Sequence, residues 1–141
     1  MLILFLVQLA CASDITLEIT EFFPDPKGKD NTDINDMEFI EIYNYGNKEI
    51  SLSEFKIKNL KNYTINLKDF HEFIKPGQHL AFYPGKELSL KNTGKEELSL
   101  IYKNQVIDKA SYSYSKESLS WSKVNSLCIL KEITPGKENY L

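Results

Sequence analysis

Short runs in which apolar and polar residues alternate recur along most of the chain. Residues 15–19 alternate strictly, with Ile, Leu and Ile separated by Thr and Glu. Residues 38–43 have the strongest β preference, and alternation returns at residues 55–58, 63–67 and 79–83. A period of two predicts strands that bury one face and leave the other polar.

Turn residues separate these runs. Pro-Gly pairs begin at Pro76 and Pro84, and an Asn-Thr-Gly turn at 92–94 lies between the apolar runs 88–90 and 98–102, which predicts a hairpin. We expect later strands near Tyr112, Trp121 and Ile129. Turn signals about every 8–12 residues, without a helical period over any long stretch, predict an all-β protein, an antiparallel sandwich or barrel.

The N-terminal residues differ from the rest of the chain, because residues 2–7 are all apolar and residues 10–12 are small or nearly so. Such a run is too short to cross a bilayer, which takes about 20 residues, but it matches a secretory signal with its cleavage site. We therefore predict a signal peptide at residues 1–12 and one β-sandwich domain at residues 13–141, secreted or at the cell surface. Two alternatives stay open, a lipid anchor on Cys11 and an apolar first strand.

Charge is unevenly distributed. The 141 residues include 17 Lys, no Arg and 20 acidic residues, and the formal net charge is −3. Residues 14–54 contain eleven acids against three Lys, a net charge of −8, whereas residues 55–141 contain nine acids against fourteen Lys, a net charge of +5. The overall acidity disfavours nucleic-acid binding. The second part nevertheless offers lysines for a polyanion-binding surface, namely Lys56, Lys58, Lys61, Lys91, Lys95 and Lys103.

Familiar catalytic motifs are missing from the sequence. It has no nucleophile elbow, phosphate-binding loop or dinucleotide fingerprint. His71 and His79 are expected to be surface residues, and His and Cys do not cluster with zinc-ligand spacing. Cys128 lies in an apolar run and is predicted to be a buried, inert thiol, without an intrachain disulfide once Cys11 is removed. These observations predict a protein that is not an enzyme.

An acidic loop is the best candidate for a binding site. Calcium takes about six to eight oxygen ligands from carboxylates and carbonyls. The loop supplies carboxylates interspersed with Asn, namely Asp25, Asp30, Asp33, Asp36 and Glu38. Their spacing does not match an EF-hand, and a solvated acidic loop is the alternative. We expect no cofactor other than calcium.

Four further residues carry specific expectations. Glu41 stands between Phe39 and Tyr43 on a strand with apolar residues on both faces, so its carboxylate should be paired or should cap a loop. Trp121 is expected in the core. Tyr112 and Tyr114 alternate with Ser, which indicates either an exposed Tyr/Ser binding face or a strand with two half-buried tyrosines.

The order of these pieces resembles the lamin tail domain. Residues 38–44 are similar to the core strand motif of that family, and the other motifs follow in the family's order over residues 15–140. They are Ile19-Thr20-Glu21, Ile50-Ser51-Leu52, Lys75-Pro76-Gly77, Asn92-Thr93-Gly94, Val106-Ile107-Asp108, Ser120-Trp121, and Thr134-Pro135-Gly136 with Asn139. The resemblance implies an immunoglobulin-like antiparallel β-sandwich. It is closest to the secreted or surface-attached prokaryotic members, so filament assembly is not expected.

Two function classes follow from this reading. The first is a secreted or cell-surface module that binds or adheres to another macromolecule, either an unknown protein or a surface polymer. The second is a nucleic-acid-associated accessory domain, by analogy with lamin tails, which the overall acidity disfavours. The chain is expected to be a monomer without a transmembrane span in its mature form.

Overall fold

The computed structural model describes residues 15–28 and 37–141. Within these residues the chain forms eleven strands and two short 3-10 helices. In chain order they are β1 (Leu17–Phe23), β2 (Phe39–Asn44), β3 (Ile50–Ser51), β4 (Phe55–Lys58), β5 (Thr64–Asn66), η3 (Leu67–Asp69), β6 (Phe73–Ile74), β7 (His79–Phe82), η4 (Gly85–Glu87), β8 (Thr93–Tyr102), β9 (Gln105–Tyr114), β10 (Ser120–Val124) and β11 (Leu127–Lys131).

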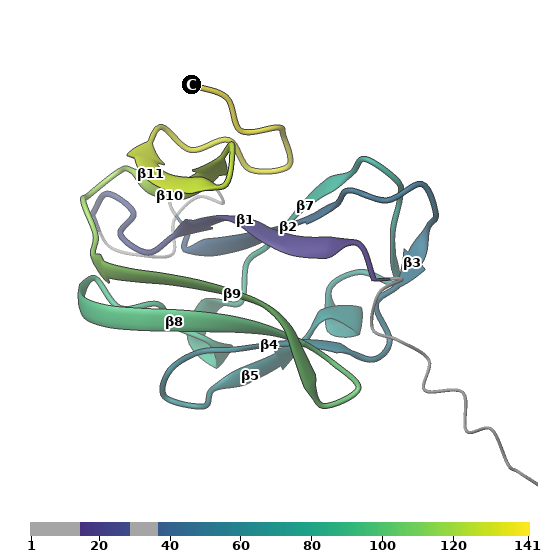
Figure 1. Ribbon diagram of the computed structural model, residues 1–141. Coiled ribbons are helices and arrows are strands. Elements are labelled where there is room, and N and C mark those ends of the chain that lie inside the picture. Colours follow the sequence, from purple (N-terminus) through teal and green to yellow (C-terminus); the bar gives the residue numbers. More distant parts are fainter. Residues whose placement is uncertain (1–14, 29–36) are drawn as a thin grey trace, which may run out of the picture.

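Two antiparallel sheets face one another (Figure 1). The five-stranded sheet has the order β11-β10-β1-β2-β7, and the four-stranded sheet has the order β5-β4-β8-β9. A short pair, β3 and β6, lies at one end. The prediction of an all-β antiparallel sandwich is confirmed.

Side chains that alternate along the sequence fill the space between the sheets. Ile40 and Ile42 of β2 are completely buried, and so, to within 1%, are Phe55 and Ile57 of β4. All four belong to the same core cluster, although they come from different sheets. The alternation seen in the sequence therefore marks the inner faces of β2 and β4.

An aromatic pair joins the two sheets. The ring of Phe22 on β1 stacks on that of Tyr112 on β9, with centroids 5.2 Å apart. The Tyr112 hydroxyl donates to Lys91 O at 2.7 Å, which gives the polar end of this buried side chain a partner. Tyr112 therefore fixes the position of the segment before β8 as well as the spacing of the sheets.

The prediction of a hairpin between residues 88–90 and 98–102, with its turn at 92–94, is wrong. β8 begins at Thr93 and runs to Tyr102, and the hairpin it forms is with β9. Leu88 and Leu90 are buried without belonging to a strand. Side chains bond the backbone there, since Leu90 N donates to Glu38 Oε2 at 2.9 Å. An apolar run bonded by side chains looks like a strand in the sequence.

A β-bulge in β1 changes the face on which its residues lie. Ile19 pairs with Ile42 and Glu21 pairs with Glu41, so Thr20 is an extra residue on β1. Ile19 and Phe22 therefore both face the core, although they are three residues apart. Glu21 is left on the outer face of the five-stranded sheet.

The predictions for the N-terminus fall outside the part of the chain that the structure describes. The signal peptide at residues 1–12 and the lipid anchor at Cys11 stay predictions. Among the described residues, no helix has the length and apolar character needed to span a membrane.

Candidate functional site

The outer face of the five-stranded sheet carries two buried carboxylates. Glu21 on β1 and Glu41 on β2 are directly opposite one another, and neither residue has any exposed surface. A buried carboxylate is costly unless it is hydrogen-bonded or neutralised. The surroundings of the two side chains show which of these applies to each.

Glu41 has three polar contacts. Thr20 Oγ1 donates to Glu41 Oε1 at 2.7 Å, and Gly136 N donates to Glu41 Oε2 at 2.7 Å. His79 Nδ1 lies 3.0 Å from Glu41 Oε1. The prediction that Glu41 is paired or caps a loop is confirmed.

His79 is not the surface residue that the sequence predicts. Its side chain is only 10% exposed, because it contacts Glu41 and its ring stacks on Tyr43 with centroids 4.2 Å apart. Tyr43 and His79 are opposite each other on β2 and β7, which explains the stacking. His71, by contrast, is exposed as predicted.

Glu21 has a different set of partners. Ser120 Oγ and Thr134 N both donate to Glu21 Oε1, the latter at 2.9 Å. Burial raises the pKa of the Glu21 carboxyl, and the charge of Glu41 raises it further, against the effect of the hydrogen bonds from Ser120 and Thr134.

The contacts of Thr134 agree with a proton on Glu21. Thr134 Oγ1 lies 2.8 Å from Glu21 Oε2 and 2.6 Å from Asn139 Oδ1. One hydroxyl hydrogen cannot fully serve two acceptors at once. A proton on Glu21 Oε2 satisfies both contacts, because Glu21 then donates to Thr134, which donates to Asn139.

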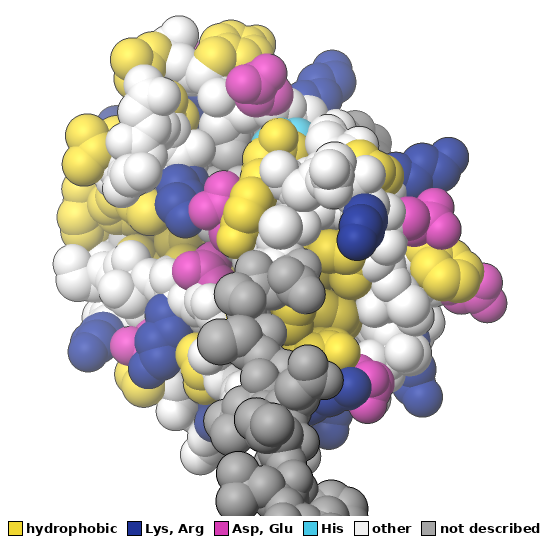
Figure 2. Space-filling view, turned by 45° about the vertical axis from the view of Figure 1, so that its right-hand side comes forward, with side chains coloured by type: hydrophobic (Ala, Val, Ile, Leu, Met, Phe, Trp, Pro, Cys, Tyr) yellow, Lys and Arg dark blue, Asp and Glu magenta, His cyan; other side chains and the backbone are white. Residues whose placement is uncertain are grey.

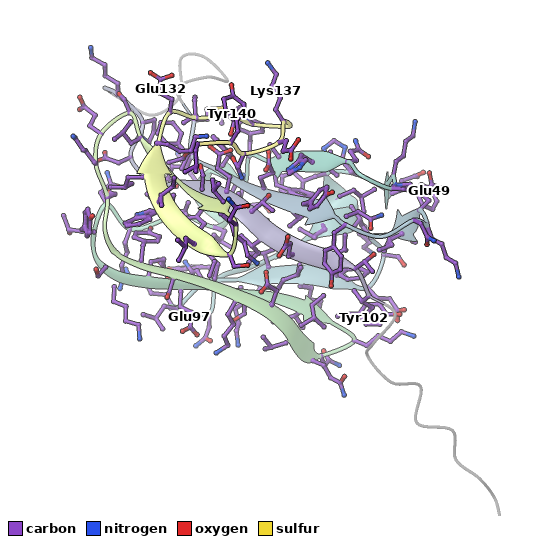
Figure 3. The ribbon with its side chains drawn as sticks, turned by 45° about the horizontal axis from the view of Figure 1, so that its top comes forward. Glu49, Glu97, Tyr102, Glu132, Lys137 and Tyr140 are labelled. Atoms are coloured by element: carbon purple, nitrogen blue, oxygen red, sulfur yellow. The ribbon has the colours of Figure 1, made fainter. Side chains whose placement is uncertain are left out.

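The C-terminal segment, residues 132–141, lies over this carboxylate pair. Figure 3 shows it with Glu132, Lys137 and Tyr140 labelled, above the five-stranded sheet. Asn139 Nδ2 donates to Thr20 O at 3.0 Å, and Lys131 Nζ lies 4.5 Å from the centroid of the Tyr140 ring. The segment thus supplies backbone and side-chain donors to a sheet face that would otherwise leave two carboxylates in water.

A cavity of about 170 Å³ opens beside the pair. Glu18, Tyr43, His79 and Lys123 line it from the strands, and the C-terminal segment closes one side. Glu18 and Lys123 form an ion pair whose side chains are 28% and 29% exposed.

The acidic loop is only partly described. Asp30, Asp33 and Asp36 lie outside the described residues, and the calcium prediction for them stays untested. Asp25 Oδ1 accepts from Asn92 Nδ2 at 3.0 Å, and Glu38 accepts from Leu90 N, so both carboxylates hold neighbouring loops. In residues 15–28 and 37–141, no three His, Cys, Asp or Glu side chains come together as a metal site.

Four lysines share the outer side of the four-stranded sheet, and we call them the lysine face: Lys56, Lys58, Lys95 and Lys109. Lys58 pairs with Ser99, which pairs with Lys109 on the next strand. Lys109 Nζ donates to Glu97 Oε1 at 2.9 Å, and this bond, with the charges of Lys109 and Lys95, lowers the pKa of Glu97. The face carries more positive than negative charge.

The other predicted lysines lie elsewhere. Lys61 is in the turn between β4 and β5, and Lys91 precedes β8, with its Nζ bonded to Lys95 O. Lys103 is in the β8–β9 turn and pairs with Glu54 at 3.4 Å. Figure 2 shows positive and negative side chains next to one another on the face that it presents.

The remaining aromatic and thiol predictions have mixed outcomes. Trp121 packs against the core although it is partly exposed, and its Nε1 donates to Tyr114 O at 2.9 Å. Tyr112 is buried, whereas Tyr114 is 54% exposed, so the two tyrosines do not form one exposed face.

The prediction that Cys128 is buried is wrong. Cys128 is exposed because β11, the strand on which it lies, is at the edge of its sheet.

Sequence reasoning missed Glu21, His79 and Lys109 as members of these sites. The sequence does contain a signal for Glu21. This Glu directly precedes the apolar pair Phe22 and Phe23, and a carboxylate that is buried with such neighbours needs hydrogen-bond partners. His79 and Lys109 carry no such signal, because their neighbours come from other strands.

The fold and the site define an immunoglobulin-like β-sandwich with antiparallel sheets. Comparison with known families matches residues 12–119 to the Lamin Tail Domain, and the chain belongs to that family. The family is one of non-enzymatic immunoglobulin-like domains. No curated protein and no solved structure matches the chain.

Proposed function

We propose that the protein is a non-catalytic, secreted or cell-surface module that binds an acidic surface polymer through the lysine face. The observation that carries the proposal is the gathering of Lys56, Lys58, Lys95 and Lys109 on one sheet face, with Glu97 as the acid among them. Membership of a non-enzymatic family supports a binding role. The signal predicted at residues 1–12 supports export.

The spacing of the lysines suits a repeating anionic chain. Lys56 and Lys58 are two residues apart on β4, a separation of about 7 Å, and Lys58 and Lys109 are two strands apart, about 10 Å. Charges spaced in these two directions suit contact with successive acidic groups of an extended polymer. The attraction is electrostatic, so it weakens as salt screens the charges.

Nucleic acid is the second candidate for this face. Arg is absent from the chain, which removes the side chain best suited to bidentate contact with phosphate. The excess of acidic residues over the whole chain further opposes DNA. We therefore favour a carboxylate polymer and use DNA as the competing probe.

Binding of polygalacturonate and of duplex DNA, measured by fluorescence anisotropy at about 50 and 200 mM salt, tests the proposal. The triple variant Lys56→Gln/Lys58→Gln/Lys109→Gln is expected to weaken polygalacturonate binding about tenfold or more and to flatten its salt dependence. The control removes the same charge from exposed positions elsewhere, Lys48→Gln/Lys86→Gln/Lys137→Gln. Equal losses in the two triples, or tighter binding of DNA, contradict the proposal.

Export is tested separately by mass spectrometry of the protein from a bacterial host. Release of a chain that begins at Ser13 supports the secreted form, and a diacylglycerol-modified Cys11 supports the anchored form. A full-length chain retained in the cytoplasm contradicts both.

A further inference from the structure

The cavity on the outer face of the five-stranded sheet is lined mainly by residues of neighbouring strands. Four strands each contribute one charged or aromatic side chain to it: Glu18 from β1, Tyr43 from β2, His79 from β7 and Lys123 from β10. These strands are hydrogen-bonded neighbours in one sheet, so the side chains are positioned by a rigid element. Glu138 of the C-terminal segment completes the rim.

The cavity has room for about one ring of a ligand. Pockets for drug-sized molecules measure roughly 300–1,000 Å³. The cavity of about 170 Å³ is well below that range. It suits a single six-membered ring with its substituents.

The walls offer both donors and acceptors. The Lys123 ammonium donates, the Glu18 carboxylate accepts, and the Tyr43 hydroxyl does both. With Nδ1 of His79 bonded to Glu41, no group in the described residues bonds Nε2, which is left for a ligand. Hydroxyl groups, which donate and accept, match this lining, whereas a hydrocarbon ring does not.

Carboxylates outnumber ammonium groups around the cavity. Glu18 and Lys123 balance each other, and Glu138 at the rim and Glu41 behind His79 add negative charge. A ligand that carries a carboxylate or phosphate is repelled, and one that carries an amine is attracted.

We propose that this cavity binds one sugar residue, neutral or amino-substituted, and rejects acidic sugars. The proposal does not rest on the lysine face, which lies on the other sheet. A failed polymer-binding experiment therefore leaves it standing, and the reverse also holds.

Three probes with the same ring separate shape from charge: the methyl glycosides of glucose, glucosamine and glucuronic acid. Titration followed by ¹H–¹⁵N NMR is expected to shift the amide signals of Tyr43, His79 and Lys123, with a Kd of about 1 mM for the glucosaminide. The glucoside is expected to bind a few-fold more weakly and the glucuronide weakest. Absence of shifts with all three, or tightest binding of the glucuronide, overturns the proposal. Ethanolamine binding as tightly as the glucosaminide also overturns it, because the site is then for ammonium alone.

Two variants locate the binding. Glu18→Gln removes the charge but keeps the shape, and it is expected to reduce the preference for the glucosaminide over the glucoside about threefold or more. Tyr43→Leu is expected to weaken both ligands. The matched control is Glu54→Gln, which breaks another Glu–Lys pair, with Lys103, away from the cavity. An equal effect of Glu54→Gln contradicts the proposal.

Discussion

Glu21 and Glu41 are paired residues of neighbouring strands, and both carboxyl groups are completely buried. Burial raises the pKa of the Glu21 carboxyl, and the charge of Glu41 adds to this effect. The contacts of Thr134 with Glu21 and Asn139 agree with a proton on Glu21. Both carboxyls accept hydrogen bonds, Glu41 from Thr20 and Gly136 and Glu21 from Ser120 and Thr134 N.

The raised pKa of Glu21 predicts a specific pH dependence of stability. A carboxyl whose folded pKa lies above its unfolded value, 4.5, binds more protons in the folded state within that window. The free energy of unfolding contributed by Glu21 therefore rises as the pH falls through the folded pKa and levels off below about 4.5.

This contribution is isolated by comparing the protein with Glu21→Gln, which does not titrate. Urea unfolding followed by Trp121 fluorescence from about pH 7 to about pH 4 measures both. The stability of the natural chain relative to the variant is expected to increase on acidification. A constant difference across this range contradicts a raised pKa.

Removal of the Thr134 hydroxyl is expected to destabilise the fold. Thr134→Val keeps the shape but deletes the contacts with Glu21 and Asn139, which leaves buried polar atoms without a partner and costs about 1–3 kcal/mol. The control is Thr64→Val. The exposed Thr64 hydroxyl donates to Asn62 O at 3.2 Å, and its loss should change stability by less than about 0.5 kcal/mol. Similar losses in the two variants would show that the Thr134 contacts carry no special weight.

Gly46 has no room for a side chain. A Cβ there would lie 2.8 Å from the Cβ of Thr16, whose hydroxyl donates to Asn44 Oδ1 at 2.8 Å. Gly46→Ala is expected to cost about 1–3 kcal/mol of stability by overpacking. In a double-mutant cycle, Thr16→Ala should relieve part of that loss, and strict additivity would refute the clash.

The exposed Cys128 predicts reaction in the folded state. In a Cys11→Ser background, a thiol reagent such as Ellman's should modify Cys128 without denaturant. Partial burial of the sulfur, with a smaller effect of Asp108, raises the pKa of the thiol, so the reaction at about pH 8 should be slower than in the unfolded chain. Protection until the protein unfolds would instead support the buried thiol that the sequence predicts.

Regular alternation in the sequence predicts the strands well. Residues 55–58 coincide with β4, and residues 38–43 coincide with β2 to within one residue. Alternation predicts which face of a strand is buried, and in these two strands the apolar residues at alternate positions are buried. The run at 88–90 is different. Its buried leucines give the same pattern as a strand, but Glu38 bonds the backbone of Leu90 and Tyr112 bonds that of Lys91.

The candidate site is less predictable than the fold. Glu41 stands within an apolar strand, and the inference that it needs partners is confirmed. Its partners His79 and Gly136 lie 38 and 95 residues away in the sequence. The bulge at Thr20 places Glu21 opposite Glu41, and its mark in the sequence is small: the alternation of residues 15–19 breaks where two polar residues separate Ile19 from Phe22.

The contacts made by β10 and by the C-terminal segment show how much of the chain belongs to the folded domain. The family match ends at residue 119, whereas Ser120, Thr134 and Gly136, which bond the buried carboxylates, all follow it. An expression clone trimmed to the matched region would discard β10, the neighbour of β1, and would expose both carboxylates. Glu41 would then keep only its contacts with Thr20 and His79. Anyone who transplants this domain into a fusion protein should therefore carry the chain through Asn139.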